Sequence, residues 1–150
     1  MVCSSPCPER QGDLACAKND NMIIRALEIF VLENSSWLRS LDYMEQENDF
    51  LKNNMSRILE SFSEKELVNW ADEYQGIILQ REAAMNLLRQ DIFKQEALIA
   101  SVRYNHSSKT NNQIVSAQKE IRTKIEYMEK EFQLLKTSFI SDVERITSFN

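Results

Sequence analysis

Proline and glycine are almost absent from this sequence of 150 residues, which contains two of each. Both prolines and Gly12 lie near the start of the chain, so only Gly76 interrupts the remainder. Turns in sheets and in alternating strand–helix folds use these residues for particular backbone angles. Their scarcity excludes extensive β structure and predicts an all-α protein. Hydrophobic residues at 43% and charged residues at 27% are typical of globular chains.

Long apolar runs and an excess of basic residues are also missing. The most apolar stretch, residues 22–32, contains Arg25 and Glu28 and is much shorter than the roughly 20 residues that span a bilayer. Lys and Arg number 18 against 23 Asp and Glu, which gives a net charge of −5 and no basic face for nucleic-acid phosphates. Since the first 20 residues also lack the pattern of a secretory signal, we expect a cytoplasmic protein that binds neither membranes nor nucleic acid.

The three cysteines, Cys3, Cys7 and Cys16, all lie in residues 1–21, ahead of the helical pattern. The single histidine, His106, is far along the chain, so the four ligands of a structural zinc site are not close together in sequence. We expect residues 1–21 to form a disordered leader with reduced thiols and no metal. A second interpretation is that this leader comes from an upstream start codon assigned in error, because Met22 stands where the helical pattern begins.

From Ile23 onward, apolar residues recur at alternating steps of four and three, which is the spacing of one buried helix face. Three such stripes follow one another, each with a few polar members. The first comprises Ile23, Leu27, Phe30, Asn34, Trp37, Leu41, Met44, Asn48, Leu51, Met55, Ile58 and Phe62. The second comprises Leu67, Ala71, Tyr74, Ile78, Arg81, Met85, Leu88, Ile92, Gln95, Ile99 and Val102. The third comprises Ile114, Gln118, Ile121, Ile125, Met128, Phe132, Leu135, Phe139, Asp142, Ile146 and Phe149.

The breaks between the stripes carry helix-capping signals. Ser63 followed by Glu66 forms a capping box, and a polar run at residues 105–108 favours a turn. Asp20 is a suitable cap for the first helix. The pattern therefore predicts helices at about 22–61, 64–104 and 108–149, each of about 40 residues and about 60 Å in length.

Connections this short place neighbouring helices antiparallel, so we expect one domain, residues 22–150, built as a coiled-coil-like, up-down-up bundle of three helices. The stripes can be aligned so that their polar members coincide. In that register Asn34 faces Gln95, Asn48 faces Arg81, and Gln118 joins the level of Asn34. A buried layer of three amides is therefore predicted. Such a layer either fixes the register or forms a small polar cavity for a ligand, and fixing the register is its better-attested use.

Arg81 has two interpretations of the same kind. Its guanidinium either holds an anionic ligand, or its stem lies along the core while the charged end reaches Glu47 or Glu131. Signatures of catalysis are missing, because a single histidine supports neither a di-iron site nor an activated nucleophile, and no Gly-rich phosphate loop is present. We therefore expect a protein that is not an enzyme and needs no cofactor.

Large apolar residues also lie off the stripes, and six of them share two levels near the middle of the predicted bundle. They are Tyr43, Phe50, Leu79, Leu87, Tyr127 and Leu134. Exposed apolar patches often mark docking surfaces, so we expect binding to another protein or to a second copy of this chain.

The alternative is a ligand-sensing bundle that uses the polar layer and Arg81. A third possibility is that the helices open at residues 104–108 and pair between chains. Gly76 suggests a close approach by a neighbouring helix or a partner chain.

Overall fold

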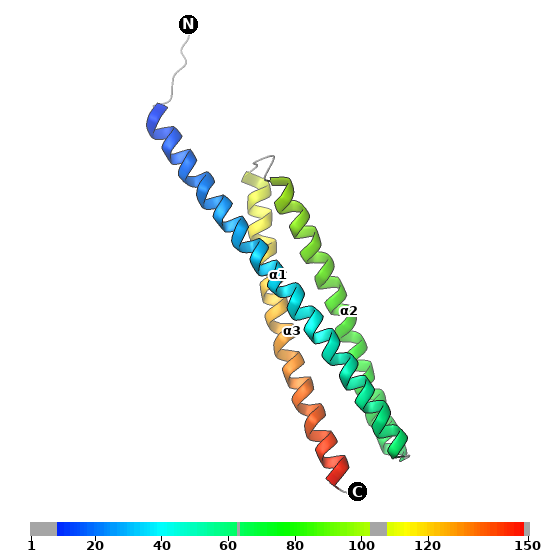
Figure 1. The fold of residues 1–150 in the computed structure, drawn as a ribbon. Helices are drawn as coiled ribbons and strands as arrows, with labels where there is room; N and C mark the ends of the chain where they lie inside the picture. Colours follow the sequence, from blue (N-terminus) through cyan, green and yellow to red (C-terminus); the bar gives the residue numbers. More distant parts are fainter. Residues whose placement is uncertain (1–8, 63, 103–107, 149–150) are drawn as a thin grey trace.

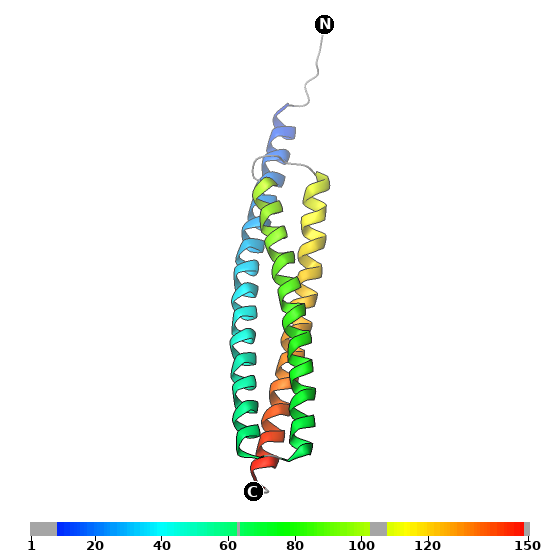
Figure 2. The same cartoon turned by 90° about the vertical axis from the view of Figure 1, so that its right-hand side faces the viewer.

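The structure, a computed structural model, describes residues 9–62, 64–102 and 108–148 of the chain. It contains three helices, α1 (Glu9–Ser61), α2 (Lys65–Val102) and α3 (Ser108–Ser148). Figures 1 and 2 show these helices side by side, with α2 antiparallel to both α1 and α3, and no strand occurs in the described ranges. The predicted all-α, three-helix bundle is therefore confirmed.

The helix ends agree with the sequence pattern within a few residues, except for the start of α1. The helix α1 begins at Glu9 and continues through Asp20, so the predicted start near residue 22 and the Asp20 cap are wrong. Seven of the 13 residues at 9–21 are good helix formers, such as Leu14, Ala15 and Lys18, and an apolar stripe is not needed for helical backbone. Residues 9–21 of the predicted leader are thus helical, whereas residues 1–8 lie outside the described residues.

Two other predicted features also fall partly outside the described residues. Ser63 of the predicted capping box is one of them, and the run 103–107, which includes His106, is the other. The first turn of α2 is hydrogen-bonded to Glu64, the residue directly before the helix. The amides of Leu67 and Val68 donate to the carbonyl of Glu64 at 3.1 and 3.3 Å, as happens at a helix N-cap.

The core follows the predicted stripes closely. Every buried side chain in the described ranges belongs to one of the three stripes. The buried apolar residues form three clusters along the bundle, centred on Leu27 and Ile114, on Leu41 and Ile125, and on Ile78 and Leu135. The amide layer lies between the first two clusters, and Asn48 and Arg81 lie between the last two. The polar members of the stripes therefore divide one long core into three apolar segments.

The N-terminal part of α1 extends beyond the other helices. Among the side chains that the structure describes, Ile23 is the first of α1 to pack against a core cluster. Residues 9–22 continue the helix past the end of α2 and the start of α3, as Figures 1 and 2 show. At 1.5 Å per residue this projecting arm is about 21 Å long.

Gly76 lies inside α2 without any close neighbour. A Cβ atom added there would meet nothing within 4 Å. The close approach by a neighbouring helix, which the sequence suggested, is therefore wrong within this chain.

Candidate functional site

The structure brings the three predicted amides together in one hydrogen-bonded layer. Gln95 Nε2 donates to Gln118 Oε1 at 3.0 Å, and Gln118 Nε2 donates to Asn34 Oδ1 at 3.1 Å. Gln95 Nε2 also donates to the carbonyl of Ile114 at 2.7 Å. All three amide side chains are buried. The predicted register is confirmed by these contacts, since each helix contributes one amide to the same level.

One donor of the layer is left over. Asn34 Nδ2 is buried and has no hydrogen-bond partner among the described residues. Gln118 Nε2 lies 3.5 Å from the Phe30 carbonyl and 3.4 Å from a Glu33 oxygen, distances at the long end for a hydrogen bond. The layer is therefore joined by two hydrogen bonds between its side chains and keeps one unpaired amide nitrogen.

The second polar level pairs Asn48 with Arg81 in position but not by a hydrogen bond. Arg81 Nη2 donates to Glu131 Oε2 at 3.1 Å, which confirms one of its two expected carboxylate partners. Glu47, the other expected partner, instead forms an ion pair with Lys136 at 2.5 Å. Asn48 Oδ1 and Arg81 Nε are buried without a hydrogen-bond partner in the described part of the chain. The guanidinium is thus held by a carboxylate of α3 at the edge of the core.

The six predicted surface residues are all exposed, but they do not line one groove. Leu87 and Tyr127 line a groove between α2 and α3. Tyr43 lines a different groove between α1 and α3, and its ring packs edge-on against Phe132 with 6.2 Å between ring centres. The remaining three line neither groove; they are Phe50, Leu79 and Leu134. Residues at one height therefore line different grooves, and docking through these six side chains stays a prediction.

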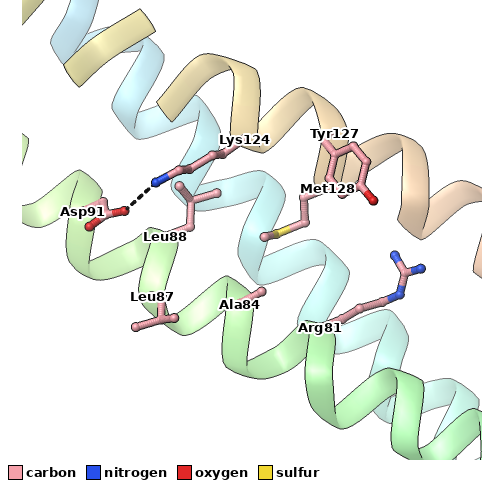
Figure 3. Close-up of a pocket in the computed structure, with 8 residues that line it drawn as sticks. All are labelled: Arg81, Ala84, Leu87, Leu88, Asp91, Lys124, Tyr127 and Met128. Carbon is pink, nitrogen blue, oxygen red and sulfur yellow. Dashed lines mark ion pairs between the residues drawn. The ribbon is translucent and has the colours of Figure 1, made fainter. Parts of the chain in front are cut away.

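The groove between α2 and α3 is the more apolar of the two. It has a volume of about 300 Å³ and is lined mainly by Ala84, Leu87, Leu88, Tyr127 and Met128. Figure 3 shows Leu88 and Met128 between the two helices, with the Tyr127 ring beside them. Leu87 and Tyr127 are 62% and 67% exposed, which is high for large apolar side chains. These two side chains are therefore accessible to another molecule.

The charged groups at the ends of this groove are paired within the chain. Lys124 Nζ lies 3.5 Å from Asp91 Oδ2 at one end, and Arg81 binds Glu131 at the other. Lys124 also lies 3.2 Å from Glu120, and a hydrogen bond to this carboxylate is the main cause that raises the pKa of Lys124. The groove consequently presents an apolar floor between two ion pairs rather than a charged pocket.

The groove between α1 and α3 differs in its chemistry. Its volume is about 450 Å³, but its walls carry Glu126, Glu129, Lys130 and Gln133. On this side of the bundle the Ser40 hydroxyl of α1 donates a hydrogen bond to Glu129 Oε1 of α3 at 2.6 Å. This groove therefore offers little continuous apolar area.

A polar cluster near the end of α3 was not identified from the sequence. Asp142 accepts hydrogen bonds from Trp70 Nε1 at 3.1 Å and from the Tyr74 hydroxyl at 2.8 Å. Arg145 donates to the other Asp142 oxygen at 2.6 Å. Burial is the main cause that raises the pKa of Tyr74. The sequence held one signal for this cluster, because Asp142, like Gln118, is a polar residue within the third apolar stripe.

No helix in the described ranges has the length and apolar character that crossing a membrane requires. Within the same ranges, no group of three or more His, Cys, Asp or Glu side chains is arranged to hold a metal ion. Comparison with protein-family models, curated proteins and solved structures finds no match to this chain.

Proposed function

We propose that this chain is a non-enzymatic helical-bundle protein that acts by binding another protein through the groove between α2 and α3. The exposure of Leu87 and Tyr127 beside the buried Leu88 carries the proposal. Apolar side chains that line a groove and remain accessible favour a partner that covers them. An adaptor or chaperone-like role fits such a surface. A cytoplasmic location is part of the proposal, since an odd number of cysteines is best kept reduced there.

The shape of the groove favours a helical partner. Its lining residues run from Arg81 to Asp91 on α2, a length of about 15 Å along the helix axis. This is about three helical turns, enough for an amphipathic helix with apolar anchors three or four residues apart. Met128 in the floor has a flexible side chain that adapts to the shape of such anchors.

The paired charges predict how binding responds to salt. Lys124 and Arg81 already neutralise carboxylates of the same chain, so few net charges are left to attract the partner. Burial of apolar area then provides most of the affinity. We expect partner binding that changes little between low and moderate ionic strength.

Affinity purification from the native cell, followed by mass spectrometry, tests the proposal. The variants Leu87→Glu and Tyr127→Glu place a charge in the groove, whereas Phe50→Glu changes a side chain of similar exposure on α1 outside it. All three positions are exposed, so the variants should keep the circular dichroism spectrum and melting temperature of the wild type. Proteins that bind the groove should be recovered with wild type and Phe50→Glu and lost with the two groove variants. Equal recovery with all four chains would refute the groove as the binding site.

A ligand-sensing role for the amide layer is the second proposal, and the unpaired Asn34 Nδ2 favours it. A small molecule with a hydrogen-bond acceptor would satisfy this donor. Gln95 also borders a second surface groove of about 300 Å³, which lies between α2 and α3 but is separate from the groove lined by Leu87 and Tyr127. The burial of all three amides and their mutual hydrogen bonds support the first proposal over this one, because a binding layer needs free donors and acceptors.

A further inference from the structure

The end of the molecule from which the arm projects carries a second apolar surface, separate from the groove of the proposed function. Met22, Ile29 and Leu32 are 69%, 57% and 70% exposed, and we call them the arm patch. With Arg25 they follow alternating steps of three and four, which places them on one face of α1. The core stripe uses the neighbouring positions Ile23, Leu27 and Phe30. The helix α1 is therefore apolar on two faces here, and only one of them packs inside the chain.

The arm patch adjoins a part of α1 that projects beyond the other two helices. The patch lies where α1 leaves the bundle, next to residues 9–22, which run beyond α2 and α3 (Figures 1 and 2). Most of the stability of a helix in a protein comes from packing against a neighbour, and α2 and α3 do not extend along this part of α1. A helix laid along the arm patch and the arm would supply that neighbour.

The arm patch is complementary to itself when two copies run antiparallel. In one register Met22 faces Leu32 of the second copy, and Arg25 faces its Ile29. A two-fold axis then passes close to residue 27, so each contact occurs twice. The two bundles extend in opposite directions from this axis, because in each copy α2 and α3 lie beside α1 only from about Ile23 onward.

The charges beside the arm patch fit the same arrangement. Arg25 and Glu28 are exposed and form no ion pair with any residue that the structure describes. In the antiparallel register Arg25 of each copy lies beside Glu28 of the other, so two positive and two negative charges gather at the axis. A parallel pair would instead place Arg25 against Arg25, which is repulsive.

We propose that two copies of this chain associate antiparallel through Met22, Ile29 and Leu32, with Arg25 of each copy paired to Glu28 of the other. The surface is distinct from the α2–α3 groove. A dimer would present two copies of that groove, one on each bundle, and would bind a partner with two sites more tightly than a monomer does.

Sedimentation velocity of the full-length chain over micromolar concentrations tests the proposal. Wild type should sediment as a dimer that dissociates on dilution. Leu32→Asp and Ile29→Asp should be monomeric. Phe50→Asp, at a similarly exposed position of the same helix away from the patch, should remain dimeric. All three changes are at exposed positions, and circular dichroism should show the same helix content as wild type.

A charge exchange tests the antiparallel pairing itself. Arg25→Glu and Glu28→Arg should each weaken the homodimer about tenfold at low salt, because four like charges then gather at the axis. An equimolar mixture of these two variants should form a heterodimer, since one copy is negative at both positions and the other positive. The double variant Arg25→Glu/Glu28→Arg should restore the homodimer.

Three results would overturn the proposal. They are a wild-type chain that stays monomeric throughout, a dimer that survives Leu32→Asp, and a mixture of the two charge variants that associates no better than either variant does. A dimer that is lost in Leu87→Glu but kept in Leu32→Asp would place self-association in the α2–α3 groove instead. Loss of groove binding in the partner experiment leaves the dimer unaffected, so the two proposals fail separately.

Discussion

Replacing Gln95 by Leu should lower the free energy of unfolding by about 1–3 kcal/mol, even though the new side chain is more apolar. In the wild type, Gln95 Nε2 is the donor to Gln118 Oε1, and both side chains are buried. Replacing Gln95 by Leu removes this donor and leaves Gln118 Oε1 buried away from water without it. The cost of one unpaired buried acceptor then exceeds the gain from the added apolar area.

Replacing all three amides of the layer by Leu should have the opposite result. Each polar group loses its partner and is itself removed, so no unpaired donor or acceptor remains, and the triple variant should be at least as stable as wild type. Its register should be less well defined. If α1 slides by one heptad against α2 in the wild type, Asn34 faces Leu88 or Val102, which leaves its amide unpaired among apolar side chains. The triple variant does not incur that penalty, so other alignments or oligomers should become populated.

Urea unfolding followed by far-ultraviolet circular dichroism measures both effects, and size-exclusion chromatography with light scattering measures the uniformity of the triple variant. Gln90→Leu is the matched control, because Gln90 is an exposed glutamine of the same helix, and its free energy should change by no more than about 0.5 kcal/mol. A single variant as stable as wild type would contradict the expected cost of the unpaired acceptor. A monodisperse triple variant that is much less stable than wild type would contradict a register-fixing role for the layer.

The remaining predictions concern Gly76, Asp142 and Tyr74. Gly76→Ala should raise the free energy of unfolding by about 0.5–1 kcal/mol in urea, because Ala has the higher helix propensity and its Cβ meets nothing within 4 Å; a decrease would show that a neighbour is crowded. Asp142→Ala should lower it by about 1–3 kcal/mol and shift the Trp70 fluorescence, since the indole and the Tyr74 hydroxyl lose their acceptor; unchanged stability and fluorescence would contradict this role. Burial raises the pKa of Tyr74 above its ordinary 10.0, so the unfolded chain releases this proton first. The stability contributed by the neutral hydroxyl should be complete below about pH 10 and decline as the pH rises through the folded-state pKa. A Tyr74→Phe variant should lack that decline, and equal alkaline slopes for both chains would count against it.

The sequence was sufficient to predict the core and the register, because both depend on periodicity. Buried positions repeat with the helical period, so the steps of three and four located every buried side chain of the described ranges. Asn34, Gln95 and Gln118 then fixed the alignment of the stripes, since only a few alignments bring all three polar residues to the same level. The contacts in the amide layer follow directly from that agreement.

Two features could not be predicted in the same way. The start of α1 was missed because the apolar stripe ends at Ile23, whereas helical backbone continues wherever propensity permits, here back to Glu9. The surface was predicted only by height along the bundle. Height places Tyr43 and Tyr127 together, but they line different grooves, because the direction in which a side chain leaves its helix decides which neighbour it meets.

Nuclear magnetic resonance of the side-chain amides in solution is the most direct test of this fold, since the groove and the amide layer both depend on one register of the helices. The structure predicts nuclear Overhauser effects from the Gln118 amide protons to Asn34 and from the Gln95 amide protons to Ile114. It also predicts that these side-chain protons exchange slowly with solvent, because they are buried. Side-chain amides that exchange rapidly and show no contact with another helix would contradict the register and the proposals that depend on it.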